Sequence, residues 1–129
     1  MTPTYFVTVL AFLICFSCSK NNDSDEGIIC TDIFVYGLNI TLIDAETQNK
    51  ITNNATNNVE VKVTEGNYKE IFKQFTGFDS FSGAGERPGT YVITVTSAKY
   101  KTFISDPITI ETDGCHVISK VLEFNLQPK

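Results

Sequence analysis

Apolar and polar residues alternate in several stretches of this chain, with the period of two that a β-strand requires. Residues 59–64 alternate valine with charged or hydroxyl-bearing side chains. Residues 91–96 place a tyrosine, an isoleucine and a valine on one face, and residues 38–42 place two leucines and an isoleucine on one face. Each stretch therefore predicts a half-buried strand.

Turn-forming residues separate these stretches. Glu65-Gly66-Asn67 follows the valine-rich strand and predicts a hairpin turn. Pro88-Gly89 predicts the turn before the strand at residues 91–96, because proline presets φ and glycine accepts unusual backbone angles. Asp106-Pro107 interrupts an apolar run over residues 103–110, which indicates an edge strand or a bulge. The last strand is expected to open at Cys115.

The segment from Tyr68 to Phe75 fits two periods. Tyr68, Ile71, Phe72 and Phe75 stand at i, i+3, i+4 and i+7, the spacing of an amphipathic helix. A strand would instead place Tyr68, Glu70 and Phe72 on one face. The preceding hairpin turn and the short span favour the strand, and the helix remains the alternative.

Composition and charge agree with a β-rich domain. The chain has 129 residues, with ten Phe, five Tyr and no Trp, a size typical of one domain. About seven strands at spacings near ten residues predict an all-β sandwich. The formal net charge is −5 without any basic run, so the charge pattern expected of a nucleic-acid-binding protein is missing.

The first residues have the layout of a signal peptide. Residues 6–16 are apolar, a run too short for a membrane-spanning helix, and a polar stretch follows Cys18. Cys15-Phe16-Ser17-Cys18 resembles a bacterial lipoprotein signal. The resemblance implies a signal over residues 1–17, palmitate or similar acyl chains on Cys18 and a location at the outer membrane. A buried first strand, or an ordinary signal that leaves Cys18 unmodified, is the alternative.

Residues 18–29 are then a flexible tether, because they are polar and acidic without a hydrophobic face. Lys20 and the acidic residues after it resemble signals that direct lipoproteins to the cell surface. A solvated linker without such a signal is the other interpretation.

Two cysteines remain for the domain once Cys15 and Cys18 are assigned to the signal and the anchor. Export permits a disulfide between Cys30 and Cys115, and a bridge enclosing about 85 residues contributes roughly 4 kcal/mol on the chain-entropy model. Its Cα atoms must lie within about 7 Å, so the first and last strands should begin at the same end and, if adjacent, run parallel. Two buried thiols are the alternative. Two cysteines and one histidine are too few ligands for a tetrahedral metal site.

Four segments resemble the carboxypeptidase regulatory-like family. They are Leu42-Ile43-Asp44-Ala45-Glu46-Thr47, residues 86–95, Tyr100-Lys101-Thr102 and residues 113–117. The resemblance implies a seven-stranded Greek-key sandwich of the prealbumin (transthyretin) type over residues 30–129. Such domains serve in folding, attachment or recognition, and the resemblance brings no catalytic residue or cofactor.

The residues with catalytic potential have simpler explanations. His116 follows Cys115, but neighbouring side chains on a strand point to opposite faces, so a nucleophilic pair is not expected. Arg87 is expected to form a local ion pair with Glu86. The Gly83-Ala84-Gly85 loop lacks the lysine of a phosphate cradle. The loop carboxylates are expected to serve turns and solubility: Asp44, Glu46, Glu65, Asp79, Glu86, Asp106 and Asp113.

The resulting hypothesis is a non-enzymatic lipoprotein domain that acts as a binding or accessory module. Its partners would be the membrane, through the lipid anchor, and a glycan or protein ligand, with no nucleic acid, metal or cofactor. Tyr68, Phe78 and Phe81 are the candidate exposed aromatic residues. A small hydrolase or peptidase that uses loop carboxylates, and a purely structural envelope component, are the alternatives.

Overall fold

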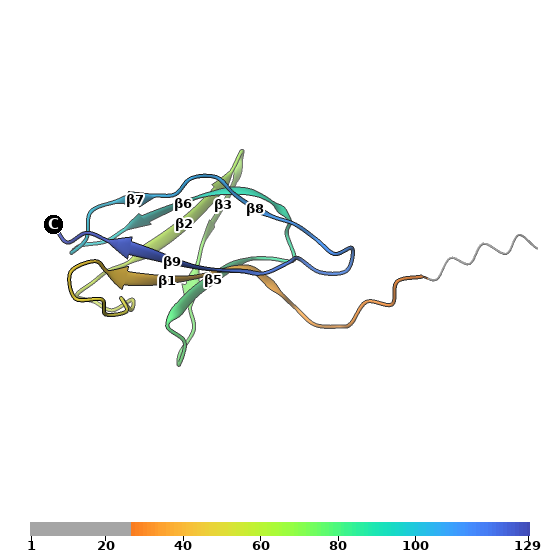
Figure 1. The fold of residues 1–129 in the computed structure, drawn as a ribbon, viewed down its shortest axis with the longest axis horizontal. Coiled ribbons are helices and arrows are strands. Elements are labelled where there is room, and N and C mark those ends of the chain that lie inside the picture. Colours follow the sequence, from red (N-terminus) through yellow and green to blue (C-terminus); the bar gives the residue numbers. More distant parts are fainter. Residues whose placement is uncertain (1–26) are drawn as a thin grey trace, which may run out of the picture.

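The computed structural model describes residues 27–129 and is built of strands, without a helix in that part of the chain (Figure 1). The predicted signal peptide, Cys18 and residues 19–26 lie outside the described residues. The strands are β1 (Tyr36–Asp44), β2 (Glu60–Glu65), β3 (Tyr68–Ile71), β4 (Lys73–Gln74), β5 (Ser80–Gly85), β6 (Gly89–Thr96), β7 (Phe103–Ile104), β8 (Ile108–Ile110) and β9 (Lys120–Leu126).

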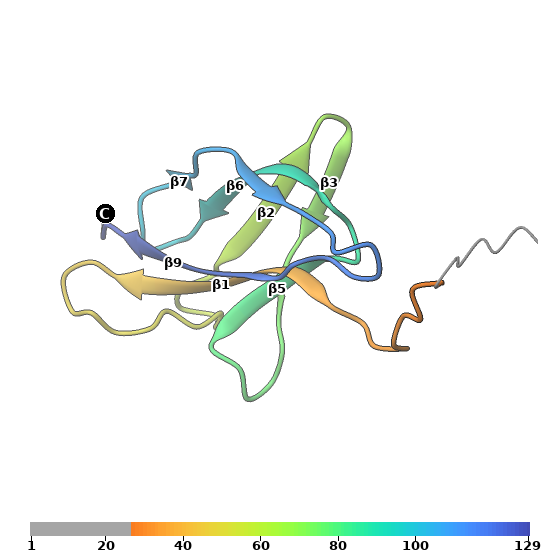
Figure 2. The ribbon, with the colours of Figure 1, turned by 45° about the vertical axis from the view of Figure 1, so that its right-hand side comes forward.

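Two sheets pack in the manner of a sandwich, which confirms the all-β prediction. One sheet has the order β4-β5-β1-β9, and the other has the order β3-β2-β6-β7, with β8 also paired to β6. Figure 2 shows the first sheet crossing below the second. Nine strand segments stand where about seven were expected, because two expected strands are each divided.

The first divided strand is the segment with the ambiguous period. It forms β3 and β4, so the strand prediction is confirmed and the helical alternative is wrong. Phe72 lies between the two strands, is 4% exposed, and donates its backbone N–H to Val61 at 2.8 Å. Ile71, which a helix would have buried with Phe72, is 56% exposed. The chain thus passes from one sheet to the other at Phe72.

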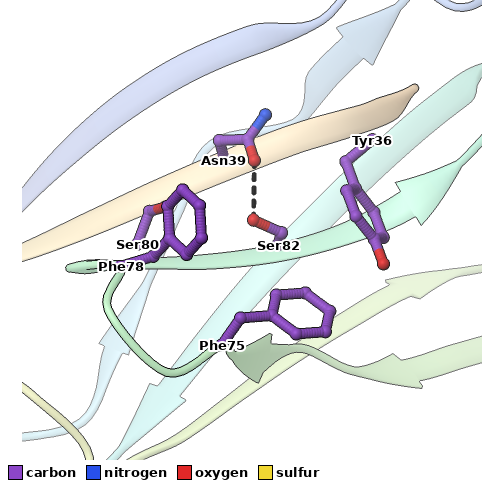
Figure 3. A pocket seen from close by; sticks show the side chains of 6 residues that line it. All are labelled: Tyr36, Asn39, Phe75, Phe78, Ser80 and Ser82. Atoms are coloured by element: carbon purple, nitrogen blue, oxygen red, sulfur yellow. Dashed lines mark hydrogen bonds between the residues drawn. The ribbon is translucent and has the colours of Figure 1, made fainter. Parts of the chain in front are cut away.

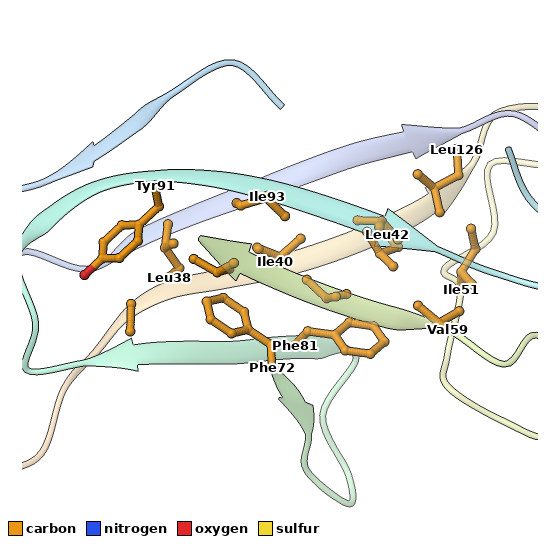
Figure 4. Packing of buried hydrophobic residues seen from close by; sticks show 14 of the residues in the cluster. Leu38, Ile40, Leu42, Ile51, Val59, Phe72, Phe81, Tyr91, Ile93 and Leu126 are labelled. Atoms are coloured by element: carbon orange, nitrogen blue, oxygen red, sulfur yellow. The ribbon is translucent and has the colours of Figure 1, made fainter. Parts of the chain in front are cut away.

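The core lies between the sheets and follows the predicted alternation (Figure 4). Leu38, Ile40 and Leu42 of β1 are completely buried, and so are Tyr91 and Ile93 of β6. Each fully buried side chain of this size contributes roughly 1.5–3 kcal/mol. Side chains of opposite parity on these strands therefore remain on the outer faces.

The first and last strands are parallel neighbours, as the cysteine positions predicted. Leu38 pairs with Lys120, and the parallel register continues to Asp44 and Leu126. The Cys30–Cys115 disulfide forms with a Cα–Cα distance of 5.3 Å, which confirms the predicted bridge.

Cys115 does not open the last strand, so that boundary was wrong. It lies in the loop before β9, which begins at Lys120. The Asp113 carboxylate accepts hydrogen bonds from the backbone N–H groups of Cys115 (2.9 Å) and His116 (2.8 Å). Such a side-chain cap favours a turn over a continued strand.

Candidate functional site

Three hollows surround Phe75 at the β4-β5 hairpin, two on the outer face of the sheet β4-β5-β1-β9 and one on its core-facing side, and they are together called the aromatic groove below. The central hollow has a volume of about 330 Å³, and its neighbours have volumes of about 400 and 350 Å³. Phe75 lines all three. Volumes of this size are typical of small-molecule sites. The central hollow is lined by Tyr36, Asn39, Phe75, Phe78, Ser80 and Ser82 (Figure 3).

Aromatic rings form the walls of the groove. The Tyr36 ring lies between two others, with centroid distances of 5.1 Å to Phe34 and 5.8 Å to Phe75. Phe34 is 64% exposed, Phe75 is 41% exposed and Phe78 is 66% exposed. The Phe34 ring rests directly on the backbone of Gly85, where a Cβ atom would overlap it. These rings therefore present open apolar surface at fixed positions.

Tyr36 reaches the groove because the pairing of β1 with β5 is irregular at its start. Tyr36 pairs with Gly85 and Leu38 with Gly83, but Gly37 and Ala84 between them do not pair. Ala84 has a φ of 51°, and a side chain on Gly37 would collide with the Ala84 carbonyl oxygen. The register is the same on both sides of this gap, so no residue is inserted, and the positive φ of Ala84 marks a local distortion of the strand pair. It brings Tyr36 beside the outward-facing Asn39, although Leu38 faces the core.

Polar groups form the floor. Ser82 Oγ donates to Asn39 Oδ1 at 2.6 Å, and Asn39 Nδ2 donates to Ser119 Oγ at 2.9 Å. A primary amide has two N–H groups and a hydroxyl has two lone pairs, so both Asn39 and Ser82 keep capacity for a ligand. Gln74 lines a neighbouring hollow, and its buried Nε2 has no hydrogen-bond partner within residues 27–129. Orphaned buried donors are unusual in folded proteins.

The structure separates the three aromatic candidates. Phe78 is exposed and lines the groove. Phe81 was wrong as an exposed residue: it is 1% exposed, because its register with Ile40 turns it into the core. Tyr68 is half-buried, packs against the core and belongs to a different cluster described below.

Most residues of the groove were not candidates, among them Phe34, Phe75, Tyr36 and Asn39. Phe34 and Phe75 stand outside regular strand alternation, so their direction could not be inferred from spacing. The direction of Tyr36 depends on the local distortion at Ala84. The direction of Asn39 could have been predicted, because a polar residue between Leu38 and Ile40 must face outward on a strand.

A second cluster, the arginine network, consists of Arg87, Glu65, Tyr68 and Tyr91. The Arg87 guanidinium lies 4.0 Å from the centroid of the Tyr68 ring and donates to Glu65 and to the Tyr91 hydroxyl at 2.8 Å. The Tyr91 hydroxyl donates to the Arg87 carbonyl oxygen at 2.7 Å. Glu65 also accepts from the Thr90 N–H at 2.6 Å.

These contacts shift the pKa values of the network. The hydrogen bond from Arg87 holds the pKa of Glu65 below its usual value. Burial, with a hydrogen bond to Glu70, raises the pKa of the Tyr68 hydroxyl. The expected ion pair between Arg87 and Glu86 was wrong, because a turn with a φ of 48° at Glu86 directs the two side chains to different partners.

Glu86 instead contacts His116. His116 Nδ1 lies 2.9 Å from Glu86 Oε1, and Nε2 lies 3.0 Å from the Thr31 carbonyl oxygen and 3.2 Å from Thr31 Oγ1. Nδ1 donates to the Glu86 carboxylate, and Nε2 donates to the Thr31 carbonyl oxygen when the ring is protonated or accepts from the Thr31 hydroxyl when it is neutral. The hydrogen bond to Glu86 raises the pKa of His116 accordingly. Glu86 and Thr31 thus occupy both ring nitrogens, so neither is free to accept a proton from a substrate.

Other loop carboxylates also have structural partners. Asp44 accepts from the backbone N–H groups of Glu46 and Thr47 and from the Tyr100 hydroxyl. Asp79 pairs with Lys50 at 2.9 Å. Within residues 27–129, no group of three or more His, Cys, Asp or Glu side chains is arranged to hold a metal ion. That part of the chain also lacks any helix of the length and apolarity needed to cross a membrane.

No protein-family model matches this chain, and no curated protein sequence matches it significantly. What the aromatic groove can bind therefore has to be inferred from its own residues and their chemistry.

Proposed function

We propose that this protein is a non-enzymatic binding module of the bacterial envelope and that the aromatic groove is its ligand surface. The exposure of Phe34, Phe75 and Phe78 around a hollow with a polar floor carries this proposal. Single exposed apolar residues are common, but a contiguous aromatic patch around a concavity is typical of a binding site. Five of the seven loop carboxylates, by contrast, are occupied by turns and ion pairs, which favours binding over hydrolysis: Asp44, Glu65, Asp79, Glu86 and Asp113.

The proposed fold is a Greek-key sandwich of the prealbumin type, as in the carboxypeptidase regulatory-like family. Three features support it. The chain passes between the sheets after β1, β3, β5 and β8, hairpins join β2 to β3 and β4 to β5, and the terminal strands β1 and β9 are parallel neighbours. Domains of this kind act as accessory modules, in agreement with a binding role.

The proposed location is the outer membrane, through a lipid on Cys18. An acylated N-terminal cysteine carries more than one chain, which is sufficient for stable anchoring. Cys18→Ala should release the protein from the membrane fraction into the soluble fraction, measured by fractionation and by mass spectrometry of the N-terminal peptide. Unchanged membrane retention of this variant would contradict the anchor and leave the groove proposal standing.

The binding proposal is tested with the full-length, processed protein on immobilised envelope polysaccharides and envelope proteins. Phe75→Ala and Phe78→Ala should reduce retention at least about tenfold, a loss of about 1.4 kcal/mol. Ile104→Ala removes an apolar residue outside the groove that is as exposed as Phe78 (66%) and serves as the matched control. Equal retention of the groove variants and the control, or no retention of any protein, would overturn the proposal.

A further inference from the structure

We infer that the free edge of β9 is a second interaction surface, which takes an extended peptide segment of a partner protein as an additional strand. The segment carries apolar side chains at alternate positions, with lysine or arginine between them. The inference goes beyond the proposed function, because β9 forms the edge of its sheet opposite to β4 and the aromatic groove. Unpaired backbone groups, an incompletely covered core and an unpaired carboxylate carry it.

The backbone of β9 has a partner strand on one side only. The Leu126 carbonyl oxygen accepts from the Ala45 N–H at 3.0 Å, on the side of β1. The next carbonyl oxygen, that of Gln127, accepts from the Lys101 N–H at 2.8 Å on the other side. Because backbone groups alternate in direction along a strand, the residues with odd numbers in β9 direct both their N–H and their C=O groups away from β1.

Three residues of this edge therefore offer unpaired backbone groups. The N–H and C=O groups of Val121, Glu123 and Asn125 have no hydrogen-bond partner in the described part of the chain. β9 spans seven residues without a proline, so it lacks two of the common devices that blunt a strand edge. Such an edge is the surface onto which an extended peptide adds through main-chain hydrogen bonds. The backbone thus specifies the conformation of the partner segment.

Contacts at both ends of β9 set the length of the free edge. Before the strand, the Ile118 N–H donates to the Glu111 carbonyl oxygen at 2.8 Å. After it, Gln127 is held by Lys101 as described above. The segment between them, residues 121–125, can take a partner strand of about five residues. The flanking residues of the partner must then turn away from the sheet.

The core is incompletely covered along the same edge. Leu122 and Phe124 have the parity that faces the core, but they are only half-buried. Their register partners in β1, Ile40 and Leu42, are completely buried. A hollow of about 350 Å³ lies beside β9, with walls from β7, β8 and β9 (Figure 2). Core-facing side chains of an added strand would fill this hollow, and the burial of apolar surface stabilises such a complex.

The charges indicate a basic partner. Asp106 lines the same hollow, which has no lysine or arginine in its lining. Its carboxylate has no hydrogen-bond or ion-pair partner within residues 27–129, unlike those of Glu65 and Asp79. A lysine or arginine in the added strand would supply that partner. A second copy of this chain would instead bring another Asp106 and another net charge of −5, so pairing of two β9 edges is disfavoured.

The test begins with an array of octapeptides and the full-length, processed protein. The peptides alternate valine, isoleucine, leucine or phenylalanine with lysine or arginine. Matched peptides carry glutamate in place of the basic residues, or have the same composition with the apolar residues contiguous. At least one alternating basic peptide should bind at least tenfold more tightly than both of its matched peptides, measured by fluorescence polarisation.

Amide hydrogen exchange, resolved by NMR spectroscopy, locates the bound peptide. In the free protein, the amides of Val121, Glu123 and Asn125 should exchange rapidly. The amides of Leu122 and Phe124, which are directed toward β1, should be protected. The peptide should slow exchange at the first three amides at least tenfold and leave the other two unchanged.

Three variants separate backbone from side-chain effects. Glu123→Pro removes the central N–H group of the free edge, which an edge strand tolerates, and should abolish binding. Glu123→Gln keeps this N–H group and should retain binding, so it is the matched control. Asp106→Lys should reverse the preference, so that the glutamate peptides bind more tightly than the basic ones. Far-UV circular dichroism and thermal melting establish that each variant is folded.

A modified peptide gives the same test without a variant of the protein. N-methylation of alternate residues removes the N–H groups that the peptide would direct toward β9. The methylated peptide should lose binding to the wild-type protein at least tenfold, because its side chains are unchanged and only the main-chain hydrogen bonds are missing.

The outcomes separate the inference from the proposed function. Failure of every array peptide to bind, binding that survives Glu123→Pro, or equal binding of basic and acidic peptides overturns the inference. A dimer that Glu123→Pro dissociates in analytical ultracentrifugation also overturns it, because the edge would then take a second copy. Peptide binding that is lost in Phe75→Ala assigns the peptide to the aromatic groove and has the same consequence. Retention of envelope material that depends on Phe75 and not on Glu123 supports the proposed function whatever the peptide result.

Discussion

The aromatic groove and the arginine network both combine aromatic rings with polar groups, but these groups have partners within the protein only in the network. In the network, the Tyr68 and Tyr91 hydroxyls and the Arg87 guanidinium all have partners within the protein. In the groove, the faces of Phe75 and Phe78 stay exposed above polar groups with spare capacity. Aromatic content therefore does not distinguish a binding site from a structural cluster. The difference lies in whether the polar groups and the ring faces already have partners within the protein.

Glycine permits a close approach in both regions, with different results. At Gly89, a Cβ atom would overlap the Glu65 carboxylate, so the missing side chain lets that carboxylate reach the Thr90 N–H. At Gly85, the missing side chain seats the Phe34 ring. The first contact closes a polar network, and the second holds an apolar ring in an exposed position.

The largest expected effect is in the arginine network. Tyr91 is completely buried, so Tyr91→Ala should lower the free energy of unfolding by about 3–5 kcal/mol. Tyr91→Phe keeps the ring and loses only the hydroxyl contacts to Arg87, and should cost about 1 kcal/mol. Urea denaturation followed by circular dichroism measures both. Similar losses for the two variants would show that the ring is not a packing anchor.

The disulfide should have the next largest effect. Cys30→Ser combined with Cys115→Ser should lower the free energy of unfolding by about 2–4 kcal/mol, because the bridge joins residues 85 apart. The affinity of the groove for its ligand should be unchanged in the folded variant. Thermal melting of the variant, and of the wild type with and without reductant, measures the effect. A melting temperature insensitive to reductant would contradict it.

A smaller effect should depend on pH. The hydrogen bond from Glu86 raises the pKa of His116 above 6.5, so its stabilising contribution is complete below that value and is lost as the pH rises through the folded pKa. For Glu86, burial raises the pKa, but hydrogen bonds from Val35, His116 and Val117 together lower it below 4.5. Its contribution is present above 4.5 and is lost in acid. The pair is therefore strongest between pH 4.5 and 6.5.

The variant for this test is His116→Gln. The difference in melting temperature between wild type and His116→Gln should be larger at pH 6 than at pH 9. A difference that stays constant across this range would show that the imidazolium does not contribute.

The smallest effect on stability should be in the groove. Phe78 is 66% exposed, so Phe78→Ala should change the free energy of unfolding by less than about 0.5 kcal/mol. The same urea denaturation as for Tyr91 measures it. A loss above 1 kcal/mol would mean that Phe78 supports the fold, and the contrast between the two regions would disappear.

The strands with strict alternation were predictable from the sequence. In β1, β2 and β6, the side chains of one parity are buried, because each of these strands has the core on one face only. The disulfide followed from the export signal and the positions of Cys30 and Cys115, and the bridge required the first and last strands to run parallel if they were adjacent. Local period and covalent constraints were sufficient for these features.

The site depended on long-range pairing that local sequence does not contain. Phe78 and Phe81 are both phenylalanines in one glycine-rich stretch, but the pairing of Phe81 with Ile40 decides which of them is buried. Arg87 found its carboxylate 22 residues away, at Glu65, and not at its neighbour. Phe75 lies just after the point where the chain changes sheets, and there the alternation gives no direction.

The pairing of β1 with β9 also sets the time at which the domain can fold. β1 lies inside its sheet, between β5 and the last strand of the domain. The backbone groups along one edge of β1 therefore stay unpaired until β9 has been made and exported. Contacts between segments so distant in the sequence slow folding. A chain exported as proposed above would stay extended during its passage through the membrane and would close its sheet only after β9 has arrived.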